Sequence, residues 1–398
     1  MILKDTLREI VKLQRTELEK RDAGITRGLA DSLDLKAPHA LIVSGIRRCG
    51  KSTLLKQIMK KLKNFYYFNF EDQRALNFEI TDFEKLDEVF HELQGDSNFY
   101  FFDEIQIVSG WERFIRKMQD LGKKFIITGS NASLLSRELG TKLTGRHLMY
   151  ELFPFSYSEM LELTNKKSAF SSFEDYFYKG GFPEYLKYNN EAILQQVFSD
   201  IIFRDIVVRY GLRDAKVVKD LAIYLLSNAG KEFSFNKLKK LFNFGSTNTV
   251  ISYVSFYEES YLLFTVSKFD FSFKKQLVNP KKVYSIDIGL SRANSVSFSK
   301  DSGRVLENLV FLYLRRMYKD IFFFKGDNEC DFLIREKGKV SQAIQVCYKL
   351  SEDNKEREIN GLKEAMSKFG LVKGIIITFN QKDKLGNIIV KPVWELLT

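Results

Sequence analysis

The sequence predicts an α/β protein that begins with a parallel sheet and continues with helical and smaller α/β domains. Between Ala40 and Leu152, short apolar runs alternate with helical patterns. Strands that are buried on both faces read as such continuous runs, so the pattern predicts a parallel sheet covered by helices. At 398 residues the chain also exceeds the ~250–300 residues at which a single core stops growing, which indicates several domains.

The first elements follow from the spacing of apolar residues. Leu3, Leu7, Ile10 and Val11 stand at helical spacing and predict one amphipathic helix over residues 1–33. The sheet domain is expected over residues 34–154. Its strands are expected at Ala40–Ser44, Phe65–Phe70, Phe99–Phe102, Phe125–Thr128 and Leu148–Leu152, and its helices at Lys51–Leu62, Phe83–Leu93, Trp111–Leu121 and Ala132–Leu139.

Three further segments are expected after the sheet domain. Residues 155–215 have a mostly helical pattern, interrupted by a turn at Gly180–Pro183. Residues 216–290 follow the order of a winged helix-turn-helix. Its helices are expected at Val217–Asn228, Phe235–Phe242 and Thr247–Glu259, and its strands at Leu262–Phe269 and Lys274–Ile286. Residues 291–398 predict a small α/β domain with helices Val305–Tyr318 and Lys355–Phe369 and strands Ile321–Lys325, Cys330–Arg335, Ser341–Tyr348 and Lys373–Thr378.

Composition narrows the class of protein. Hydrophobic residues make up 44% of the chain and aromatic residues 14%, which is enough for packed cores. The net charge of +11 favours either an acidic partner, such as nucleic acid, or a lysine-rich solvated surface. Cys49, Cys330 and Cys347 are scattered, which argues against zinc and for a reduced compartment. Because no signal peptide or membrane-length apolar run is read, we expect a cytoplasmic protein without a membrane partner.

A glycine-containing loop follows the first expected strand and precedes a helix. Its sequence, Gly45-Ile46-Arg47-Arg48-Cys49-Gly50-Lys51-Ser52, is a Walker A pattern. Glycines allow backbone N–H groups to surround a phosphate, and the helix N-terminus attracts negative charge. Lys51 is expected to bind the β- and γ-phosphates, and the Ser52 hydroxyl to bind Mg²⁺. The residues expected to contact ATP are Gly45, Ile46, Arg47, Arg48, Cys49, Gly50, Lys51, Ser52 and Thr53.

Two carboxylates end the apolar run that begins at Phe99, as in a Walker B strand. Asp103 is expected to bind Mg²⁺, and Glu104 to act as the general base that activates water. We expect them on a strand next to that of the loop. The strand Phe65–Phe70 lies between the two motifs in the chain. With Glu104, it favours P-loop ATPases that have an inserted strand and a catalytic glutamate over nucleotide kinases or small GTPases.

Three further residues are candidates for this site. Ser130 and Asn131 follow the strand Phe125–Thr128, whose carboxyl end is expected beside the phosphates. They would sense the γ-phosphate or orient water, or instead cap the helix expected from Ala132. Arg146 precedes the fifth strand and is the candidate arginine finger, acting in its own chain or in a neighbouring one; a solvated arginine is the alternative.

These motifs together resemble a family of bacterial and archaeal AAA-type P-loop ATPases. The resemblance covers nearly the whole chain through GIRRCGKSTLL, FFDEIQ, ITGSNASLLS, LTGRHLMYELFPFSYSEML, GGFPEYL, RDIVVRYGLRD and ENLVFLYLRR with ECDFLI. It implies ATP and Mg²⁺ as cofactors, an AAA-like (ASCE) sheet domain, a helical lid with a winged helix, and a C-terminal domain similar to PD-(D/E)xK nucleases. It implies no particular substrate.

The nuclease-like resemblance carries over to particular positions of this sequence. It implies metal-binding or catalytic roles for Glu307, Asp331 and Gln345, with a lysine two residues after Gln345. Cys347 stands at that lysine position, and Lys349, two residues on, is the candidate replacement. Nuclease chemistry needs carboxylates around Mg²⁺ and a lysine near the water. We therefore favour a degenerate nuclease fold used for binding or assembly.

Contact with double-stranded DNA is a separate expectation. The helix Thr247–Glu259, which would enter a DNA groove, contains no Lys or Arg. Lysines flank it instead, and they favour contact with DNA backbone over base reading. They are Lys237, Lys239, Lys240, Lys268, Lys274, Lys275, Lys281 and Lys282. The sequence leaves three functions open: an ATPase that drives or switches a DNA-contacting assembly, an ATP-regulated module for a protein partner or a homo-oligomer, and an ATP-regulated nuclease.

Overall fold

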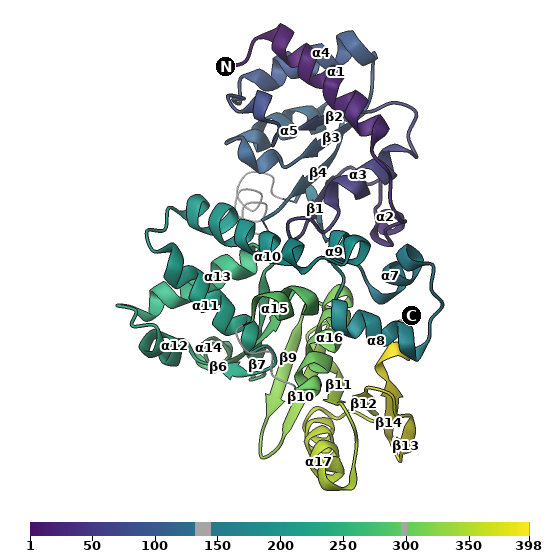
Figure 1. Ribbon diagram of the computed structural model, residues 1–398, viewed down its shortest axis with the longest axis vertical. Coiled ribbons are helices and arrows are strands. Elements are labelled where there is room, and N and C mark those ends of the chain that lie inside the picture. Colours follow the sequence, from purple (N-terminus) through teal and green to yellow (C-terminus); the bar gives the residue numbers. More distant parts are fainter. Residues whose placement is uncertain (132–144, 296–300, 398) are drawn as a thin grey trace. The chain divides into compact units, whose positions relative to one another are not determined.

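The computed structural model describes residues 1–131, 145–295 and 301–397 (Figure 1). The chain divides into two compact units, Met1–Phe153 and Pro154–Thr398, and each is described by itself. The helix expected at Ala132–Leu139 lies outside the described residues. Within the described ranges, no helix combines the length and apolar character needed to cross a bilayer.

A five-stranded parallel sheet forms the centre of the N-terminal unit, as predicted. Its strands are β1 (Ala40–Ser44), β2 (Tyr66–Asn69), β3 (Phe99–Asp103), β4 (Lys124–Gly129) and β5 (His147–Glu151). The order across the sheet is β2-β3-β4-β1-β5, with every neighbouring pair parallel. The expectation that the carboxylate strand lies next to the loop strand was wrong, because β4 lies between β1 and β3.

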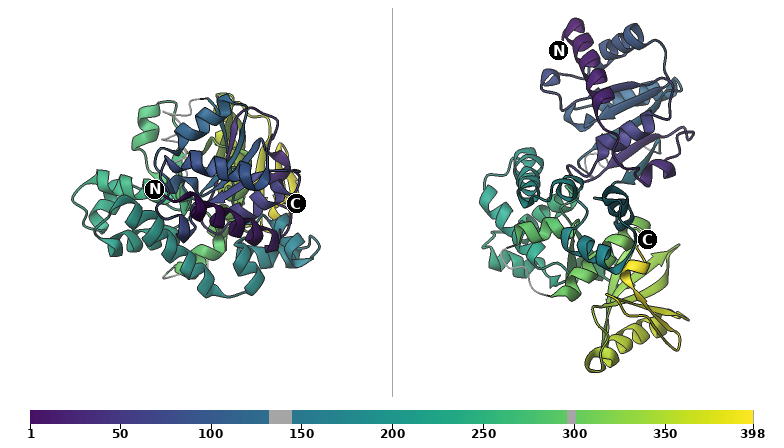
Figure 2. Two further views of the ribbon diagram at one scale, coloured as in Figure 1. Left: turned by 90° about the horizontal axis from the view of Figure 1, so that it is seen from above. Right: turned by 45° about the vertical axis from the view of Figure 1, so that its right-hand side comes forward.

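Helices cover this sheet and contribute apolar residues to its core. They are α1 (Lys4–Lys20), α2 (Leu29–Ser32), α3 (Lys51–Met59), α4 (Asp82–Gln94) and α5 (Trp111–Asp120). Apolar residues of α1, α4 and α5 join one cluster with residues of the sheet. The purple α1 lies along the blue α4 in Figure 1 and beside the helices of this unit in Figure 2. The single helix predicted over 1–33 was wrong: α1 ends at Lys20, Gly24 has a φ of +59°, and a separate short helix, α2, follows.

The C-terminal unit begins with helices. They are α7 (Tyr157–Thr164), α8 (Phe170–Lys179), α9 (Pro183–Tyr188) and α10 (Glu191–Asp200), which continues as a π-helical turn over Ile201–Val208. The predicted glycine turn separates α8 from α9. Gly180 has φ +73°, and a Cβ on Gly181 would lie 2.1 Å from the carbonyl oxygen of Phe155. Only glycine allows this turn and this close packing.

Residues 216–290 contain the three expected helices and two strands near the expected positions, with an additional short strand, β6 (Glu232–Phe233), between the first two helices. The others are α11 (Ala215–Ser227), α12 (Phe235–Leu241), α13 (Thr247–Glu259), β7 (Leu263–Lys268) and β8 (Lys281–Ser285). β8 pairs antiparallel with both β6 and β7. The strand predicted from Lys274 was too long, because Ser272 caps a short helix, α14 (Phe273–Val278), by accepting a bond from the Lys275 N–H.

The last elements extend the same sheet. They are α15 (Ile288–Asn294), α16 (Ser302–Met317), β9 (Ile321–Lys325), β10 (Glu329–Glu336), β11 (Lys339–Cys347), α17 (Glu352–Phe369), β12 (Gly374–Thr378), β13 (Asp383–Leu385) and β14 (Ile388–Pro392). The sheet has nine strands in the order β13-β14-β12-β11-β10-β9-β7-β8-β6. β7 pairs with β9 through Ser267 and Phe322, so the segments expected as separate domains, 216–290 and 291–398, share one sheet.

Candidate nucleotide site

The loop between β1 and α3 has the conformation that its glycines predict. Gly50 has φ +101° at the start of α3, a value that L-residues rarely adopt. A Cβ on Gly45 would lie 2.2 Å from the carbonyl oxygen of Leu152, so a side chain there would push the loop away from the end of the sheet. Arg48 has φ +61° without being glycine. The loop therefore keeps a tightly curved backbone at the carboxyl edge of the parallel sheet.

Lys51 lies inside this loop and contacts the candidate general base. Its ammonium donates to the carbonyl oxygens of Gly45 (3.0 Å) and Ile46 (3.3 Å) and lies 3.4 Å from Oε1 of Glu104. Burial alone would lower the pKa of Lys51, but the nearby Glu104 and Asp103 carboxylates and the Cys49 thiol together outweigh it, so the pKa is raised. Lys51 therefore carries a positive charge in a buried position.

Asp103 ends β3 and is held by three hydroxyl groups. Thr128, on β4, donates to Oδ1, Tyr67 donates to Oδ2 at 3.4 Å, and Ser52 also bonds to this carboxylate. Burial first, and then the charge of Glu104, raise the pKa of Asp103. A cation bound here would stabilise the ionised form of Asp103, because its positive charge would oppose both burial and the negative charge of Glu104.

Glu104 has a strained backbone that directs its side chain toward Lys51. Its φ of +54° is rare for a residue that is not glycine. Its N–H donates to the Thr128 hydroxyl, and its Oε2 accepts from Gln106 (2.5 Å) and from the Ser130 N–H (3.3 Å). Burial would raise the pKa of Glu104, but Lys51 and these donors lower it. Glu104 is therefore an ionised carboxylate that can accept a proton.

Ser130 and Asn131 follow β4 and are both buried. The Ser130 hydroxyl has no hydrogen-bond partner among the described residues, although it is only 2% exposed. A buried hydroxyl without a partner is costly, so this one is suited to a ligand. Their alternative role as a cap concerns a helix outside the described residues.

Arg146 lies at the amino-terminal ends of the strands, whereas the loop lies at their carboxyl ends. It directly precedes β5, which runs parallel to β1, so it is level with the start of β1 while the loop follows the end. It pairs with Asp120, and its carbonyl oxygen accepts from the Ala40 N–H at 3.0 Å. This placement contradicts a finger role within its own chain, because a full strand separates it from the loop. A role in a neighbouring chain stays a prediction.

Sequence reasoning missed two residues that organise the loop. Thr128 bridges Asp103 and Glu104, a role that follows from the position of β4 between β1 and β3. Arg27 is 3% exposed and donates to the carbonyl oxygens of Cys49 and Phe153, both at 2.6 Å. No motif identifies Arg27, since it lies 22 residues before Cys49.

The residues at this edge fit Mg-ATP. Lys51 supplies a charged donor, and Ser52 and Asp103 supply oxygen atoms of the kind that Mg²⁺ prefers. The helix N-terminus of α3 favours phosphate, and the Ser130 hydroxyl, which has no partner within residues 1–131 and 145–295, is available to a ligand. The arrangement can therefore bind a magnesium-bound triphosphate beside an ionised carboxylate.

The C-terminal unit contains a second polar cluster, at the positions that the nuclease-like resemblance implies. Glu307 lies on α16, Asp331 on β10 and Gln345 on β11, and all three line a cavity of ≈ 470 Å³. Gln345 accepts from the Asp331 N–H at 3.2 Å. Lys349 is exposed and is not among the residues lining this cavity, so the structure does not bring it to the site as predicted.

Lys282 occupies the centre of this cluster, which sequence reasoning missed. Its ammonium lies 2.7 Å from Glu329, 2.9 Å from Glu307 and 3.0 Å from Asp331. Tyr284 also donates to Glu307, at 2.6 Å. Burial, and then the charge of Asp331, raise the pKa of Glu307 to about 7. Lys282 is only 3% exposed, which contradicts its predicted contact with DNA phosphates.

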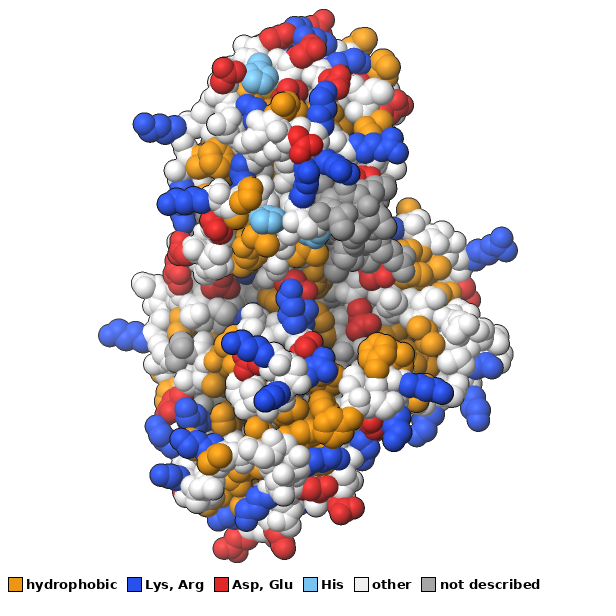
Figure 3. Space-filling view, turned by 180° about the vertical axis from the view of Figure 1, so that it is seen from behind, with side chains coloured by type: hydrophobic (Ala, Val, Ile, Leu, Met, Phe, Trp, Pro, Cys, Tyr) orange, Lys and Arg blue, Asp and Glu red, His pale blue; other side chains and the backbone are white. Residues whose placement is uncertain are grey.

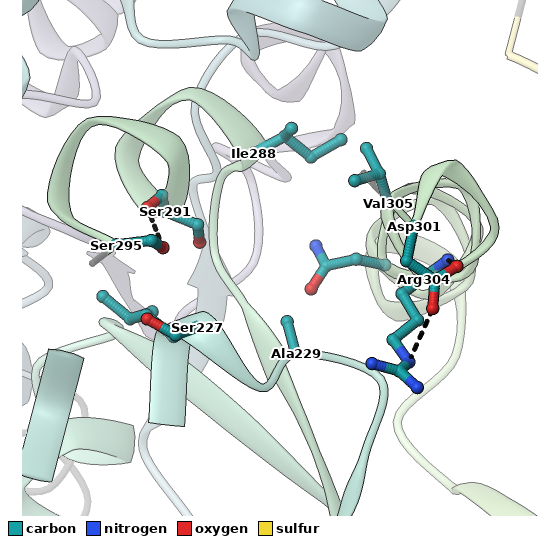
Figure 4. Close-up of a pocket in the computed structure, with 10 residues that line it drawn as sticks. Ser227, Ala229, Ile288, Ser291, Ser295, Asp301, Arg304 and Val305 are labelled. Atoms are coloured by element: carbon teal, nitrogen blue, oxygen red, sulfur yellow. Dashed lines mark hydrogen bonds and ion pairs between the residues drawn. The ribbon is translucent and has the colours of Figure 1, made fainter. Parts of the chain in front are cut away.

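A smaller cavity of ≈ 40 Å³ adjoins the cluster (Figure 4). Asp301 and Arg304, which line both cavities, form an ion pair at 3.2 Å near the start of α16. Ile288 and Val305 supply apolar walls.

Comparison with known proteins adds a family to this geometry. A model described as an AAA domain matches residues 37–161, and two models described as domains of unknown function (DUF8612 and DUF4143) match residues 170–300 and 302–396. "Uncharacterized protein MJ1544" of Methanocaldococcus jannaschii is 35% identical, over 99% of this chain and 96% of the relative. An uncharacterized protein of Haemophilus influenzae is 29% identical over 80% of this chain and 84% of its own length.

Solved structures also match this chain, among them two at 14% identity. A signal transduction ATPase (STAND) protein with a tetratricopeptide repeat sensor, from Pyrococcus horikoshii, is 14% identical with a TM-score of 0.30, over 75% of this chain and 46% of its own. AMPPCP-bound DnaA from Aquifex aeolicus is 14% identical with a TM-score of 0.29, over 63% of this chain and 88% of its own. With its AAA domain and near full-length match, this chain belongs to the same family as the Methanocaldococcus jannaschii protein.

Proposed function

We propose that this protein binds Mg-ATP at the loop between β1 and α3 and hydrolyses it. The observation that carries the proposal is the meeting of Lys51, Ser52, Asp103 and Glu104 at one edge of the sheet, with Lys51 3.4 Å from Glu104. A buried lysine, an oxygen pair suited to Mg²⁺ and an ionised glutamate are the groups that phosphoryl transfer to water requires.

Each of these residues has a distinct role. Lys51 binds the β- and γ-phosphates, and Ser52 with Asp103 would hold the metal ion. Mg²⁺ bound there would supply positive charge that stabilises the phosphate oxygens in the transition state. Glu104 accepts a proton from the attacking water at a carboxylate oxygen. Ser130 donates its hydroxyl to the phosphate end of the nucleotide.

The test compares two variants of the full chain with matched controls. Lys51→Ala should weaken ATP binding at least about tenfold, or 1.4 kcal/mol, because a buried charge that faces phosphate is lost. Glu104→Gln should keep ATP binding and slow hydrolysis by about 10²–10⁴-fold, the usual contribution of a general base. Titration with a fluorescent ATP analogue and phosphate release measure the two effects.

Exposed residues provide the controls. Lys60→Ala removes a lysine from the end of the same helix, and Glu9→Gln changes an exposed glutamate of α1. Both controls should bind and hydrolyse ATP like the wild type. Wild-type turnover in Glu104→Gln would disprove the general-base role, and wild-type affinity in Lys51→Ala would disprove the phosphate site.

We propose further that ATP turnover drives or switches an assembly that includes the C-terminal unit, with duplex DNA or a partner protein as its target. Lys237, Lys240, Lys274 and Lys275 are exposed and available to DNA phosphates, whereas Lys282 is buried. On the face drawn in Figure 3, basic side chains are interspersed with acidic and apolar ones.

The ATPase rate with and without duplex DNA, at two salt concentrations, separates the two targets. Stimulation that weakens as salt rises supports DNA. An unchanged rate supports an ATP-regulated module that acts on a protein partner or a second copy of the chain.

A further inference from the structure

The cluster around Lys282 disagrees with the metal site that the nuclease-like resemblance implies. Such a site needs Glu307 and Asp331 to direct carboxylate oxygens at a divalent cation. In this protein both direct an oxygen at the Lys282 ammonium, at 2.9 and 3.0 Å, and Glu329 adds a third at 2.7 Å. One lysine therefore occupies the space between the carboxylates.

Several other ligand atoms of the cluster are also engaged. Oδ2 of Asp331 accepts from the Val346 N–H at 3.0 Å, and Oε1 of Glu307 accepts from Tyr284 as well as from Lys282. Gln345, at the third position of the pattern, binds the Asp331 N–H with its oxygen and donates its amide to Glu358 at 2.6 Å. Its oxygen is therefore used within the protein.

The neighbouring carboxylates are also paired with cations. Asp301 pairs with Arg304 at 3.2 Å, and Glu358 pairs with Arg357 at 2.5 Å. Mg²⁺ binds oxygen at about 2.0–2.1 Å in an octahedral shell, which needs several oxygens free to converge on one point. A fixed ammonium at that point repels a second cation and takes up these oxygens.

We infer that the Lys282 ammonium replaces the divalent cation in this cluster, so that the C-terminal domain holds an internal ion-pair centre and not a magnesium-dependent nuclease site. Lys282 comes from β8, whereas its partners come from α16 and β10. The centre therefore joins the segment of residues 216–290 to the C-terminal segment, in addition to the pairing of β7 with β9. Its role is to hold the two segments as one body.

The first experiment measures Mn²⁺ binding to the full chain without nucleotide. Asp103→Asn is introduced throughout, so that the loop site does not contribute. Titration of free Mn²⁺ followed by electron paramagnetic resonance should give the same binding with and without Asp331→Asn. Binding that is lost with Asp331→Asn, or DNA cleavage that depends on Asp331, would overturn the inference.

The second experiment removes the internal cation. Lys282→Met should lower the melting temperature of the C-terminal unit by about 10 °C, because three carboxylates lose the lysine that they share. Mn²⁺ should then restore part of that loss, and should not do so in Lys282→Met/Asp331→Asn. Lys281→Met, the adjacent and more exposed lysine of β8, is the matched control and should melt close to the wild type without responding to Mn²⁺.

Each outcome of the second experiment supports or overturns the inference that Lys282 takes the place of a metal ion. A wild-type melting temperature in Lys282→Met would overturn the inference, because the ion pairs would then contribute nothing. If Lys282→Met fails to fold while Lys281→Met folds, the need for an internal cation is supported, and the Mn²⁺ titration of the chain that retains Lys282 decides on the metal.

Discussion

Single residues in this protein act through their backbone conformation as much as through their side chains. Glu104 reaches Lys51 from a φ of +54°, and Gly50 allows the loop to turn into α3 at +101°. Strain of this kind persists only where surrounding contacts hold it, as the Thr128 hydroxyl holds the Glu104 N–H. The geometry of the candidate site therefore depends on neighbours that carry no chemistry themselves.

Arg27 is such a neighbour, and its removal should weaken nucleotide binding. Its guanidinium fixes the carbonyl oxygens of Cys49 and Phe153. Arg27→Met keeps much of the side-chain volume but loses both bonds, so the loop should lose its fixed curvature. We expect ATP affinity to fall about tenfold, or 1.4 kcal/mol, with little change in the rate of the bound state.

An exposed arginine provides the control for Arg27. Arg116→Met, on α5, should leave ATP affinity unchanged. A slower rate at saturating ATP, with unchanged affinity, would contradict the positioning role assigned to Arg27. Isothermal titration with a non-hydrolysable analogue and steady-state kinetics separate the two effects.

At the scale of elements, the glycine turn between α8 and α9 is joined to α15 by a buried carboxylate. Asp287 accepts from the N–H groups of Gly181 (2.6 Å) and Leu290 (2.8 Å) and so caps α15. A Cβ on Gly180 would lie 2.5 Å from this carboxylate. The glycines of the turn are therefore required by the approach of Asp287, a residue more than 100 positions away.

The pKa of Asp287 predicts a specific pH dependence of stability. Burial raises it to about 6, above its usual value near 3.8. Below pH 3.8 the group is protonated in both the folded and the unfolded chain and costs nothing. As pH rises from 4 to 6 the unfolded chain ionises first, so the free energy of unfolding falls by up to about 3 kcal/mol.

Asp287→Asn removes this dependence. The free energy of unfolding of the variant, relative to the wild type, should rise by about 3 kcal/mol between pH 4 and pH 7, on top of a constant loss from one weaker hydrogen bond. Urea unfolding followed through Trp394, which lies in the same unit, measures the difference. A difference that does not change with pH would contradict the burial of an ionisable Asp287.

At the scale of the whole molecule, the two compact units each contain one tryptophan. Trp111 is fully buried in the N-terminal unit and Trp394 lies in the C-terminal unit. Unfolding of each unit can therefore be followed separately, with Trp394→Phe leaving only Trp111 and Trp111→Phe leaving only Trp394.

A non-hydrolysable Mg-ATP analogue should stabilise the two units differently. At 100 times its dissociation constant, a ligand that binds only the folded N-terminal unit adds about 2.7 kcal/mol to its stability. The free energy of unfolding measured through Trp111 should rise by that amount, and the value measured through Trp394 should not change. Equal shifts in both signals would mean that the units unfold together.

Much of the fold was predictable because strands buried on both faces leave continuous apolar runs in the chain. Ala40–Ser44 is predicted and observed at the same residues, and Phe99–Phe102 differs from β3 only by Asp103. The predictions that were wrong concern where elements end: the helix predicted over 1–33 ends at Lys20, and α14 replaces the start of a predicted strand. A short helix such as α14, whose first N–H groups are capped by one serine, changes the spacing of apolar residues very little and is therefore hard to predict.

The sequence by itself determined the parallel sheet, the loop after its first strand and the residues Lys51, Ser52, Asp103 and Glu104, because local spacing and motif chemistry are written along the chain. Only the tertiary structure decided that β4 lies between the two motifs, that Arg27 supports the loop, that Arg146 lies at the far edge and that Lys282 fills the acidic cluster. These depend on the order of strands in a sheet and on contacts between residues far apart, which no local pattern encodes.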